Sequence, residues 1–382
     1  MDKQTGTQQN WTKVIAYLSL FTLISGDSLF GDAYIQPNPI WFTWLAVGLV
    51  CLVGAIWALA QADWLRVLKQ TPVELYLLLL LMLSSSLWSA YGTETWISFG
   101  VQLWVSIVAI FFVATFDWKQ ILTFLATAIR VIIFGSFLIE LIASSFKGIF
   151  GTLLPANFTE LNQALAKSGH LFDGGRIQGL LGNANYVAAW ALMGVIIFAI
   201  EIAVKKSNRW ISISSLVAAV LMIWVAKSAG IIFATIAVLL ATIVSLLAEG
   251  KDKATRHRYY RVAWSVAGFA MFFVLVFRRS VFELLGKSPD MTHRSDIWRK
   301  VLSLISQRPL EGWGFTGVWA PGTKPLDKLV VINGETYYQA HNAYLDMWLQ
   351  LGAVGLILFL ILLVRTFIKT WRLGVHHSNP LY

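Results

Sequence analysis

The sequence predicts an all-α, polytopic integral membrane protein. Three observations lead to this fold class: a very apolar composition, long uncharged runs, and basic residues that alternate between loops. Of the 382 residues, 57% are hydrophobic and 13% are charged. Because soluble domains carry about 25% charged residues, a chain this apolar cannot cover a surface that faces water. Lipid is the solvent that fits this composition.

The apolar runs predict about ten transmembrane helices, each long enough to cross the hydrocarbon core. They lie near residues 14–31, 40–60, 73–91, 95–115, 119–143, 184–204, 210–227, 229–248, 262–278 and 343–364. The first is the weakest, because Asp27 interrupts it. The stretch 210–248 is too long for one span, so we expect two helices joined by a tight turn at 227–230.

Basic residues in alternate short loops set the expected orientation, since cytoplasmic loops are rich in Lys and Arg. These positions are Lys3, Lys13, Arg66, Lys69, Lys119, Lys205, Lys206, Arg209, Lys251, Lys253, Arg256, Arg258, Arg261, Arg365, Lys369 and Arg372. The short loops 32–39 and 92–94 carry neither residue. We therefore expect one transmembrane domain over residues 1–382, with both termini in the cytoplasm and long outer loops at 144–183 and 279–342.

The second outer loop is itself basic, which indicates either an anionic partner outside the membrane or a merely solvated loop. The net charge of +10 is therefore explained in part by the basic cytoplasmic loops and in part by this outer loop. Because these locations account for the charge, we expect no nucleic acid partner. Within this loop, apolar residues recur at helical spacing near 295–307, after a possible capping residue, Ser295. This pattern predicts an amphipathic helix on the outer membrane surface. The glycine and aromatic stretch 311–317 fits sugar stacking and a membrane-interface loop equally well.

Arg176 follows two glycines where the first outer loop re-enters the membrane, close to Asn185. A guanidinium group in such a place can hold a phosphate through its planar fork. An interfacial arginine that simply reaches toward water is the more common alternative.

Arg130 lies near the middle of the fifth predicted span, ten residues before Glu140. A charge at that depth costs about 3 kcal/mol on insertion scales, so it normally faces the bundle interior or a cavity. Lys227, at an outer turn, could face the same cavity. The alternative for Arg130 is an internal salt bridge.

His341 lies at the outer mouth of the last span. Histidine titrates near pH 6.5 and can accept a proton from a sugar hydroxyl. A lone interfacial histidine is more often structural. Asp346 lies five residues further along and is not expected to orient it.

The sequence shows no Asp-x-Asp pair, no His/Cys/Glu cluster with metal-ligand spacing and no GxxxxGK[ST] phosphate loop. Its single cysteine, Cys51, can form no internal disulfide. We therefore expect no metal or other cofactor, and a donor that is already activated.

From about residue 170 to 360 the chain resembles the O-antigen ligase/polymerase family of bacterial envelope enzymes, and most of all exopolysaccharide polymerases. The resemblance rests on the order of short motifs: Arg176–Asn185, Lys227-Ser228, Arg294-x-x-x-Trp298, Arg308-Pro309-Leu310-x-Gly312-x-Gly314, and His341-Asn342-x-Tyr344-Leu345 before Gly352 and Gly355. Gln350 departs from it, because the family often has an acidic residue there. The chain also has one span after the His-Asn motif, where family members often have more.

The resemblance implies a GT-C-like glycosyltransferase of the inner membrane whose active site faces outward. A glycan would pass from undecaprenyl pyrophosphate to an acceptor hydroxyl. Arg176 and Arg294 would stabilise the leaving pyrophosphate with support from Lys227, and His341 would activate the acceptor. The expected substrate-binding residues are Lys227, Asn342, Asn185, Trp298, Tyr344 and Arg130.

The expected partners are the lipid-linked donor, a glycan or lipid acceptor, membrane lipid, a flippase and a chain-length regulator. Polymerisation of repeat units is the leading interpretation. A ligase that moves the glycan to lipid A–core or another acceptor uses the same residues. A transporter or flippase is the alternative of another class. Such proteins tend to show internal repeats, interrupted helices and intramembrane acids. This sequence shows no internal repeat, and its notable buried charge, Arg130, is basic.

Overall fold

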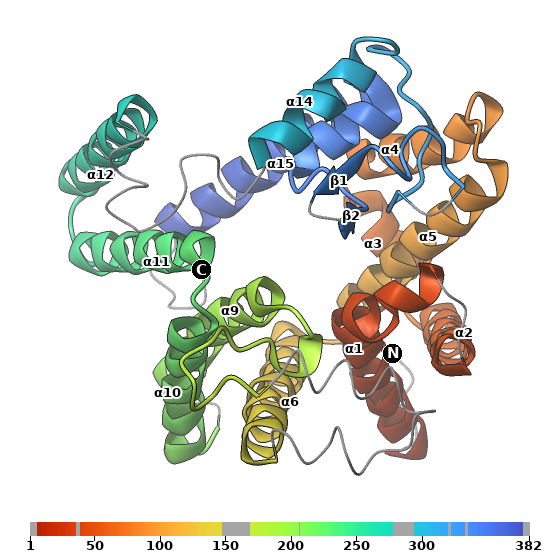
Figure 1. Cartoon of the computed structure of the whole chain (residues 1–382). Helices are drawn as coiled ribbons and strands as arrows, with labels where there is room; N and C mark the ends of the chain where they lie inside the picture. The colour runs from red at the N-terminus through yellow and green to blue at the C-terminus, as the bar shows by residue number, and fades with distance from the viewer. Residues whose placement is uncertain are drawn as a thin grey trace. The chain divides into compact units, whose positions relative to one another are not determined.

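The computed structural model describes residues 6–35, 39–146, 169–205, 207–277, 294–319, 322–332 and 335–376 (Figure 1). These residues form two compact units, and each is described by itself. Unit 1 contains residues up to 64 and residues 108–243, whereas unit 2 contains residues 65–107 and 244–378. The division does not test whether residues 1–382 form one transmembrane domain, so that stays a prediction.

Unit 1 is a bundle of helices that begin and end where local sequence signals place them. Its elements are α1 (Gly6–Ile35), α2 (Pro39–Ala60), α6 (Trp118–Ser145), the 3-10 turn η3 (Gly179–Leu181), α9 (Ala184–Ala203), α10 (Arg209–Ala226) and most of α11 (Ala229–Ala248). Asp117 and Gln120 form a capping box at the start of α6. Lys227 ends α10 in the left-handed conformation, with φ 49°. This break between α10 and α11 confirms the tight turn predicted at 227–230.

The core of unit 1 lies where α6, α9 and α10 pack together (Figure 1). Ile129, Phe198 and Met222 are fully buried there. Small residues let the backbones come close: a Cβ atom on Gly194 would lie 2.9 Å from the side chain of Ile129. The packing of these three helices fixes the loops at their ends.

Arg130 is paired inside this bundle and not free for a ligand. Its guanidinium group forms an ion pair with Glu201, which is 2% exposed, and donates a 2.9 Å hydrogen bond to Ser215. It also lies over the ring of Phe198, 4.8 Å from the centroid. Of the two interpretations, the structure shows the internal salt bridge. Substrate binding by Arg130 stays a prediction, and these contacts do not add to it.

We expect Arg130→Met to destabilise the purified protein by about 3 kcal/mol, because it leaves the buried Glu201 carboxylate without its cation. Thermal unfolding in detergent checks this. The double variant Arg130→Met/Glu201→Met should recover most of the loss, since it removes both charges. A single variant as stable as the wild type would contradict the structural role.

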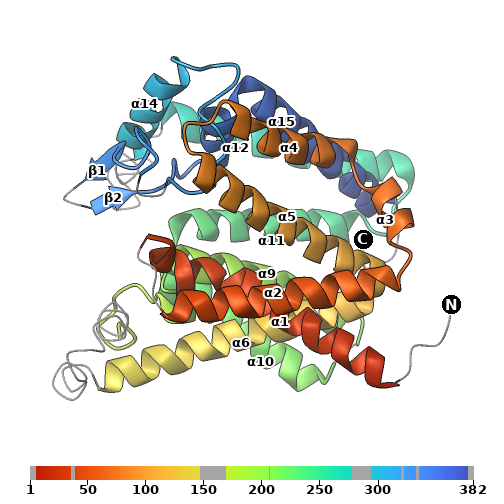
Figure 2. The ribbon, with the colours of Figure 1, turned by 90° about the vertical axis from the view of Figure 1, so that its right-hand side faces the viewer.

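Unit 2 holds the remaining helices and a small hairpin. Its elements are α3 (Trp64–Gln70), α4 (Val73–Ser84), the 3-10 turn η1 (Ser85–Leu87), most of α5 (Gly92–Thr115), α12 (Lys253–Val276), α14 (Arg294–Ile305), β1 (Val330–Ile332), β2 (Glu335–Tyr337) and α15 (Ala343–His376). In Figure 2, α4 runs beside α15, and α14 lies beside the β1–β2 hairpin. The strands are antiparallel, with Val331 opposite Thr336. The all-α prediction misses them because three residues are too few for an alternating pattern to stand out.

Helix α14 confirms the predicted helix but corrects its environment. Ile297 and Val301 are fully buried in a core with Trp319 and Leu349. This apolar face therefore packs on protein and not on lipid. The helix also begins at Arg294, so Ser295 lies inside its first turn and is not the cap.

Helix α15 is broken at Gly352, and a loop fills the break. Gly352 has φ 66° and ψ −171°, far from helical values. The amides of Trp313 and Gly314 donate 2.9 Å hydrogen bonds to the carbonyls of Leu349 and Gln350, and Ala353 donates one to Pro309. The loop thus takes over bonds that an unbroken helix would make within itself. The stretch 311–317, expected to bind sugar or line the interface, mainly completes this kink.

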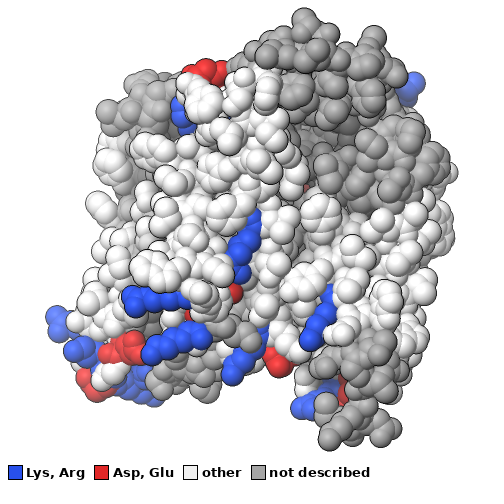
Figure 3. Space-filling model, turned by 90° about the horizontal axis from the view of Figure 1, so that it is seen from below, with Lys and Arg blue, Asp and Glu red and all other residues white. Residues whose placement is uncertain are grey.

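Six described helices are long and apolar enough to cross a membrane, namely α5, α6, α9, α10, α11 and α15. Much of their surface is apolar and exposed: only 6% of the most apolar window of α11 is buried. Figure 3 shows a broad area of uncharged side chains, with most Lys and Arg toward one edge. Exposed apolar surface of this extent fits lipid, which makes the chain a multi-pass membrane protein. The count of about ten spans, the GT-C likeness and the orientation stay predictions.

Candidate functional site

Glu140, near the end of α6, organises the loop that carries Arg176. The side chain is fully buried. One carboxylate oxygen accepts hydrogen bonds from the amides of Gly169 and His170 (2.8 and 3.1 Å), and the other accepts from Gln178 and Gly179 (3.0 and 3.1 Å). Four donors on two oxygens satisfy a carboxylate, which only accepts. The loop from residue 169 to 179 is therefore tied to α6 at both ends.

The loop presents Arg176 to a group of side chains that we call the Arg176 cluster: Arg176, Asn185, Lys227 and Ser228. Arg176 donates to the carbonyl of Ala226 at 3.2 Å and to the side-chain oxygen of Asn185 at 3.0 Å. Ser228 donates to the same Asn185 oxygen at 2.9 Å, and Lys227 donates to the carbonyl of Gly174. The structure thus brings the motif Arg176–Asn185 into contact with the turn Lys227-Ser228, about 40 residues further along the chain.

The Arg176 cluster carries two positive charges beside two helix N-termini. Arg176 and Lys227 are both exposed, and within the described ranges no carboxylate forms an ion pair with either. Asn185 lies in the first turn of α9, and Ser228 immediately precedes α11. Helix N-termini favour anions, and a fixed guanidinium group binds phosphate oxygens well. This arrangement suits a phosphate or pyrophosphate group.

We expect Glu140→Gln to loosen the loop around Arg176. The glutamine amide would turn an NH2 group toward two of the four backbone donors, so two amides would lose their acceptor. Hydrogen exchange measured by mass spectrometry should become at least about tenfold faster in residues 169–179. The matched variant Glu249→Gln, at an exposed position, should leave this segment unchanged. Unchanged exchange in Glu140→Gln would contradict the anchoring role.

His341, in unit 2, is held by a tight set of backbone bonds. It adopts the left-handed conformation with φ 50°. Before it, the amide of Ala340 donates to Asp346 at 2.9 Å, and the carbonyl of Ala340 accepts from the indole of Trp298 at 3.0 Å. Asp346 also accepts from the indole of Trp319 at 3.1 Å. These contacts fix where the His341 imidazole lies.

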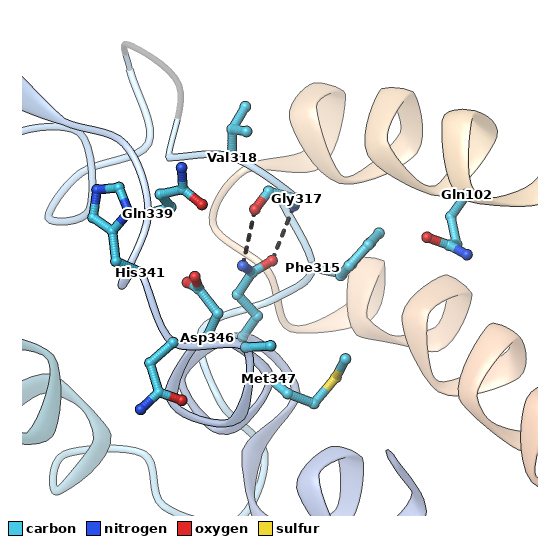
Figure 4. A pocket seen from close by; sticks show the side chains of 11 residues that line it. Gln102, Phe315, Gly317, Val318, Gln339, His341, Asp346 and Met347 are labelled. Atoms are coloured by element: carbon cyan, nitrogen blue, oxygen red, sulfur yellow. Dashed lines mark hydrogen bonds between the residues drawn. The ribbon is translucent and has the colours of Figure 1, made fainter. Parts of the chain in front are cut away.

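The imidazole lies at the edge of a cavity of about 430 Å³, which we call the His341 cavity (Figure 4). It is lined by Gln102, Phe315, Gly317, Val318, Gln339, His341, Asn342, Ala343, Asp346, Met347 and Gln350. This volume is in the usual range for small-molecule sites. All of the lining residues belong to unit 2.

The other predicted site residues of unit 2 have mainly structural contacts. Asn342 caps α15 by accepting from the amides of Tyr344 and Leu345 at 3.0 and 3.3 Å, although it also lines the cavity. Trp298 positions the backbone before His341. Tyr344 is 51% exposed and lies outside the cavity lining, with its ring 6.0 Å from that of Phe359. Whether these residues bind substrate stays a prediction.

Sequence reasoning missed the positioning residues Glu140, Asp346 and Gln350. Gln350 accepts from the amides of Thr316 and Gly317 at 2.9 Å and donates to the carbonyl of Gly317 at 3.1 Å. Glu140 and Gln350 hold loops that are about 30 residues away in the sequence, so local spacing could not reveal their role. Asp346 holds Trp319, 27 residues away, and Ala340, only 6 residues away. The available signal was a polar residue inside an apolar helix, which needs a partner.

Burial, assisted by Arg294, lowers the pKa of His341. Loss of hydration and the positive charge of Arg294 together lower the pKa of His341 from its ordinary value of 6.5. The imidazole is therefore mostly neutral at pH 7, as a proton acceptor must be. Among the described residues, no group of three His, Cys, Asp or Glu side chains has the geometry of a metal site.

We expect Arg294→Gln to raise the pKa of His341, because it removes a nearby positive charge. An NMR titration of ¹⁵N-histidine-labelled protein in detergent checks this, with the signal assigned from His341→Gln. Arg299→Gln on the same helix, with its arginine paired to Asp296, serves as the control. A pKa for His341 at or above 6.5 in the wild type would contradict the arrangement.

The helices and these two groups define a multi-pass membrane protein with a cationic cluster and a histidine-bearing cavity. Residues 184–360 match the sequence profile of the family described as O-Antigen ligase. Over this region, a little under half of the chain, the sequence is similar to the O-antigen ligase/polymerase family.

Two relatives illustrate the similarity. The chain is 26% identical over 112 residues to the "Exopolysaccharide production protein ExoQ" of Rhizobium meliloti. This match covers 28% of the present chain and 26% of the relative. It is also 33% identical over 89 residues to the "Putative polysaccharide ligase" of Rickettsia felis. This second match covers 21% of each chain. The matches thus span about a quarter or less of these relatives' lengths. No solved structure matches the chain significantly.

Proposed function

We propose that the protein is a glycosyltransferase of the bacterial inner membrane. It passes a glycan from a lipid pyrophosphate, most simply undecaprenyl pyrophosphate, to an acceptor hydroxyl on the outer side. The favoured reaction joins one lipid-linked repeat unit to another. The resemblance of the His341 motif to exopolysaccharide polymerases supports this choice of reaction, and one relative is named for exopolysaccharide production.

The Arg176 cluster carries the proposal. As the bond between the sugar and pyrophosphate breaks, its electron pair leaves with the pyrophosphate and increases the negative charge there. Cations fixed in advance stabilise that charge in the transition state. Arg176 is fixed through Asn185, Ala226 and the Glu140-anchored loop, so little reorganisation is needed when charge develops.

His341 supplies the other half of the proposed chemistry. The acceptor oxygen attacks the anomeric carbon, and its proton passes to the neutral imidazole. Loss of hydration, together with the charge of Arg294, lowers the pKa of His341 and keeps the base neutral. Arg294 can also bind a phosphate oxygen, the role that the family resemblance implies for it.

A ligase is the second candidate, because the Rickettsia relative is named as a polysaccharide ligase. It would use the same cluster and the same base but a different acceptor. A transporter is less favoured, since binding and release alone do not require a histidine kept neutral beside an arginine.

The test supplies the purified protein with only the undecaprenyl-pyrophosphate-linked repeat unit of its host and follows the products by gel and mass spectrometry. A ladder of longer glycans is the expected result, and Arg176→Gln should reduce it at least about a hundredfold. Arg209→Gln, an exposed arginine of the same unit, should leave it unchanged.

The absence of a ladder with the native repeat unit would overturn the polymerase proposal. Transfer of the glycan to a separately added acceptor would then support the ligase. Equal activity of Arg176→Gln and the wild type would remove the assigned role of the cluster.

A further inference from the structure

The polar side chains that line the His341 cavity fall into two sets. Those of Asp346, Gln350 and Asn342 form hydrogen bonds with the backbone of the protein, and Asp346 also accepts one from an indole. They give the cavity its shape. Gln350 forms two hydrogen bonds with the backbone of Gly317, and dashed lines mark them at Gly317 in Figure 4.

The second set has no hydrogen-bond partner within the described residues. The side-chain amides of Gln102 and Gln339 and the imidazole of His341 form no hydrogen bond there, although each lines the cavity. Gln102 comes from α5, whereas Gln339 and His341 flank the buried Ala340. In Figure 4, Gln339 lies between His341 and Val318, with Gln102 beyond Phe315.

Two unpaired amides and an imidazole around one cavity match the surface of a sugar. Each amide offers both donors and an acceptor, as vicinal hydroxyls require. Phe315, Val318 and Met347 add apolar wall, against which the C–H face of a sugar ring can pack. The lining contains no Lys or Arg and does contain the Asp346 carboxylate, so it suits an uncharged ring better than an acidic one.

We propose that the His341 cavity is the acceptor subsite, and that Gln339 and Gln102 select an uncharged sugar ring through its hydroxyl groups. The inference rests on the proposed function, since it assigns His341 the hydroxyl that reacts. Gln339 and Gln102 act on hydroxyls beside that one. They are specificity-determining residues and take no part in proton transfer.

The test uses the full-length protein in detergent. The probe is the host's repeat-unit oligosaccharide, prepared by depolymerising its own polysaccharide so that it carries neither lipid nor phosphate. Binding is followed by saturation-transfer NMR and calorimetry. Where a ladder forms, the same oligosaccharide is then tested as a competing acceptor. Wild-type protein should bind it, with the sugar protons nearest to the protein belonging to an uncharged ring.

Gln339→Leu and Gln102→Leu should each weaken binding and raise the acceptor KM about tenfold, while kcat stays within about twofold. Neither change breaks a hydrogen bond of the protein, so both variants should fold, and thermal unfolding confirms this. Gln307→Leu makes the same substitution at an exposed position of unit 2 and should bind as the wild type does.

The outcomes separate this inference from the proposed function. A ladder with an unchanged acceptor KM in both variants overturns the subsite and leaves the transferase standing. Binding that both variants weaken, without a ladder under any condition, supports sugar recognition by the cavity and overturns the transfer. Failure of the wild type to bind the oligosaccharide, with a lipid chain found in the cavity instead, overturns the subsite.

Discussion

Replacing Gly352 by alanine is expected to cause the largest loss of stability among single substitutions in unit 2. A Cβ atom at this position would overlap the carbonyl of Leu310 and lie 2.7 Å from the amide nitrogen of Glu311. Both are backbone atoms, which cannot move aside as a flexible side chain can. The φ of 66° adds further strain for any residue except glycine. We expect a destabilisation of at least about 4 kcal/mol.

The consequence should reach the His341 cavity. The loop displaced from the kink contains Phe315 and Gly317, which line that cavity. Thermal unfolding and hydrogen exchange of residues 309–319 measure the effect. Gly268→Ala, in α12, is the matched control, because a Cβ atom there meets no atom within 4 Å. Alanine should be neutral or slightly stabilising in that helix. A Gly352→Ala protein as stable as this control would show that α15 can close without the loop.

The sequence predicts features that depend on neighbouring residues. Long apolar runs locate the helices, and the length of the run 210–248 requires the break at Lys227. The proximity of Arg176 to Asn185 follows from their short separation along the chain. In each case, the sequence pattern and the structural feature that it predicts involve the same short segment of the chain.

Long-range partners are what the sequence could not supply. The apolar stripe of α14 looks the same whether it faces lipid or protein, and only the structure shows Val301 and Ile297 packed with Leu349. Gly352 and Gly312 look like flexible residues, but a Cβ on Gly312 would lie 2.5 Å from the Gln350 carbonyl. Both glycines are required by the close approach of two backbones.

Asp346 shows that a short-range partner can also be missed within the candidate site. Asp346 lies five positions after His341, so helical spacing gives no reason for the two side chains to meet. The structure shows a different connection: Asp346 accepts from the backbone of Ala340, and thereby holds the residue before His341. Asp346 is thus a positioning residue that acts through the chain.

Replacing His341 by alanine is expected to reduce transfer about a hundred- to ten-thousandfold, the range that a general base contributes. Binding of the lipid-linked donor should stay within about twofold, because the proposed donor contacts belong to the Arg176 cluster and Arg294, and not to His341. Single-turnover transfer and donor binding, measured on one preparation, separate the two effects. His257→Ala, at an exposed position of α12, should leave both unchanged.

The pH profile distinguishes a base from a structural residue. A base works only when neutral, so the wild-type rate should fall as pH drops through the pKa of His341, below 6.5. Alanine at 341 should abolish this acid limb, and added imidazole should restore part of the rate. A purely structural histidine would lose stability on substitution, keep the acid limb in whatever activity remained, and gain nothing from imidazole. Rescue by imidazole would therefore assign the proton to the ring of His341 itself, because a diffusible base can replace proton transfer but cannot rebuild a fold.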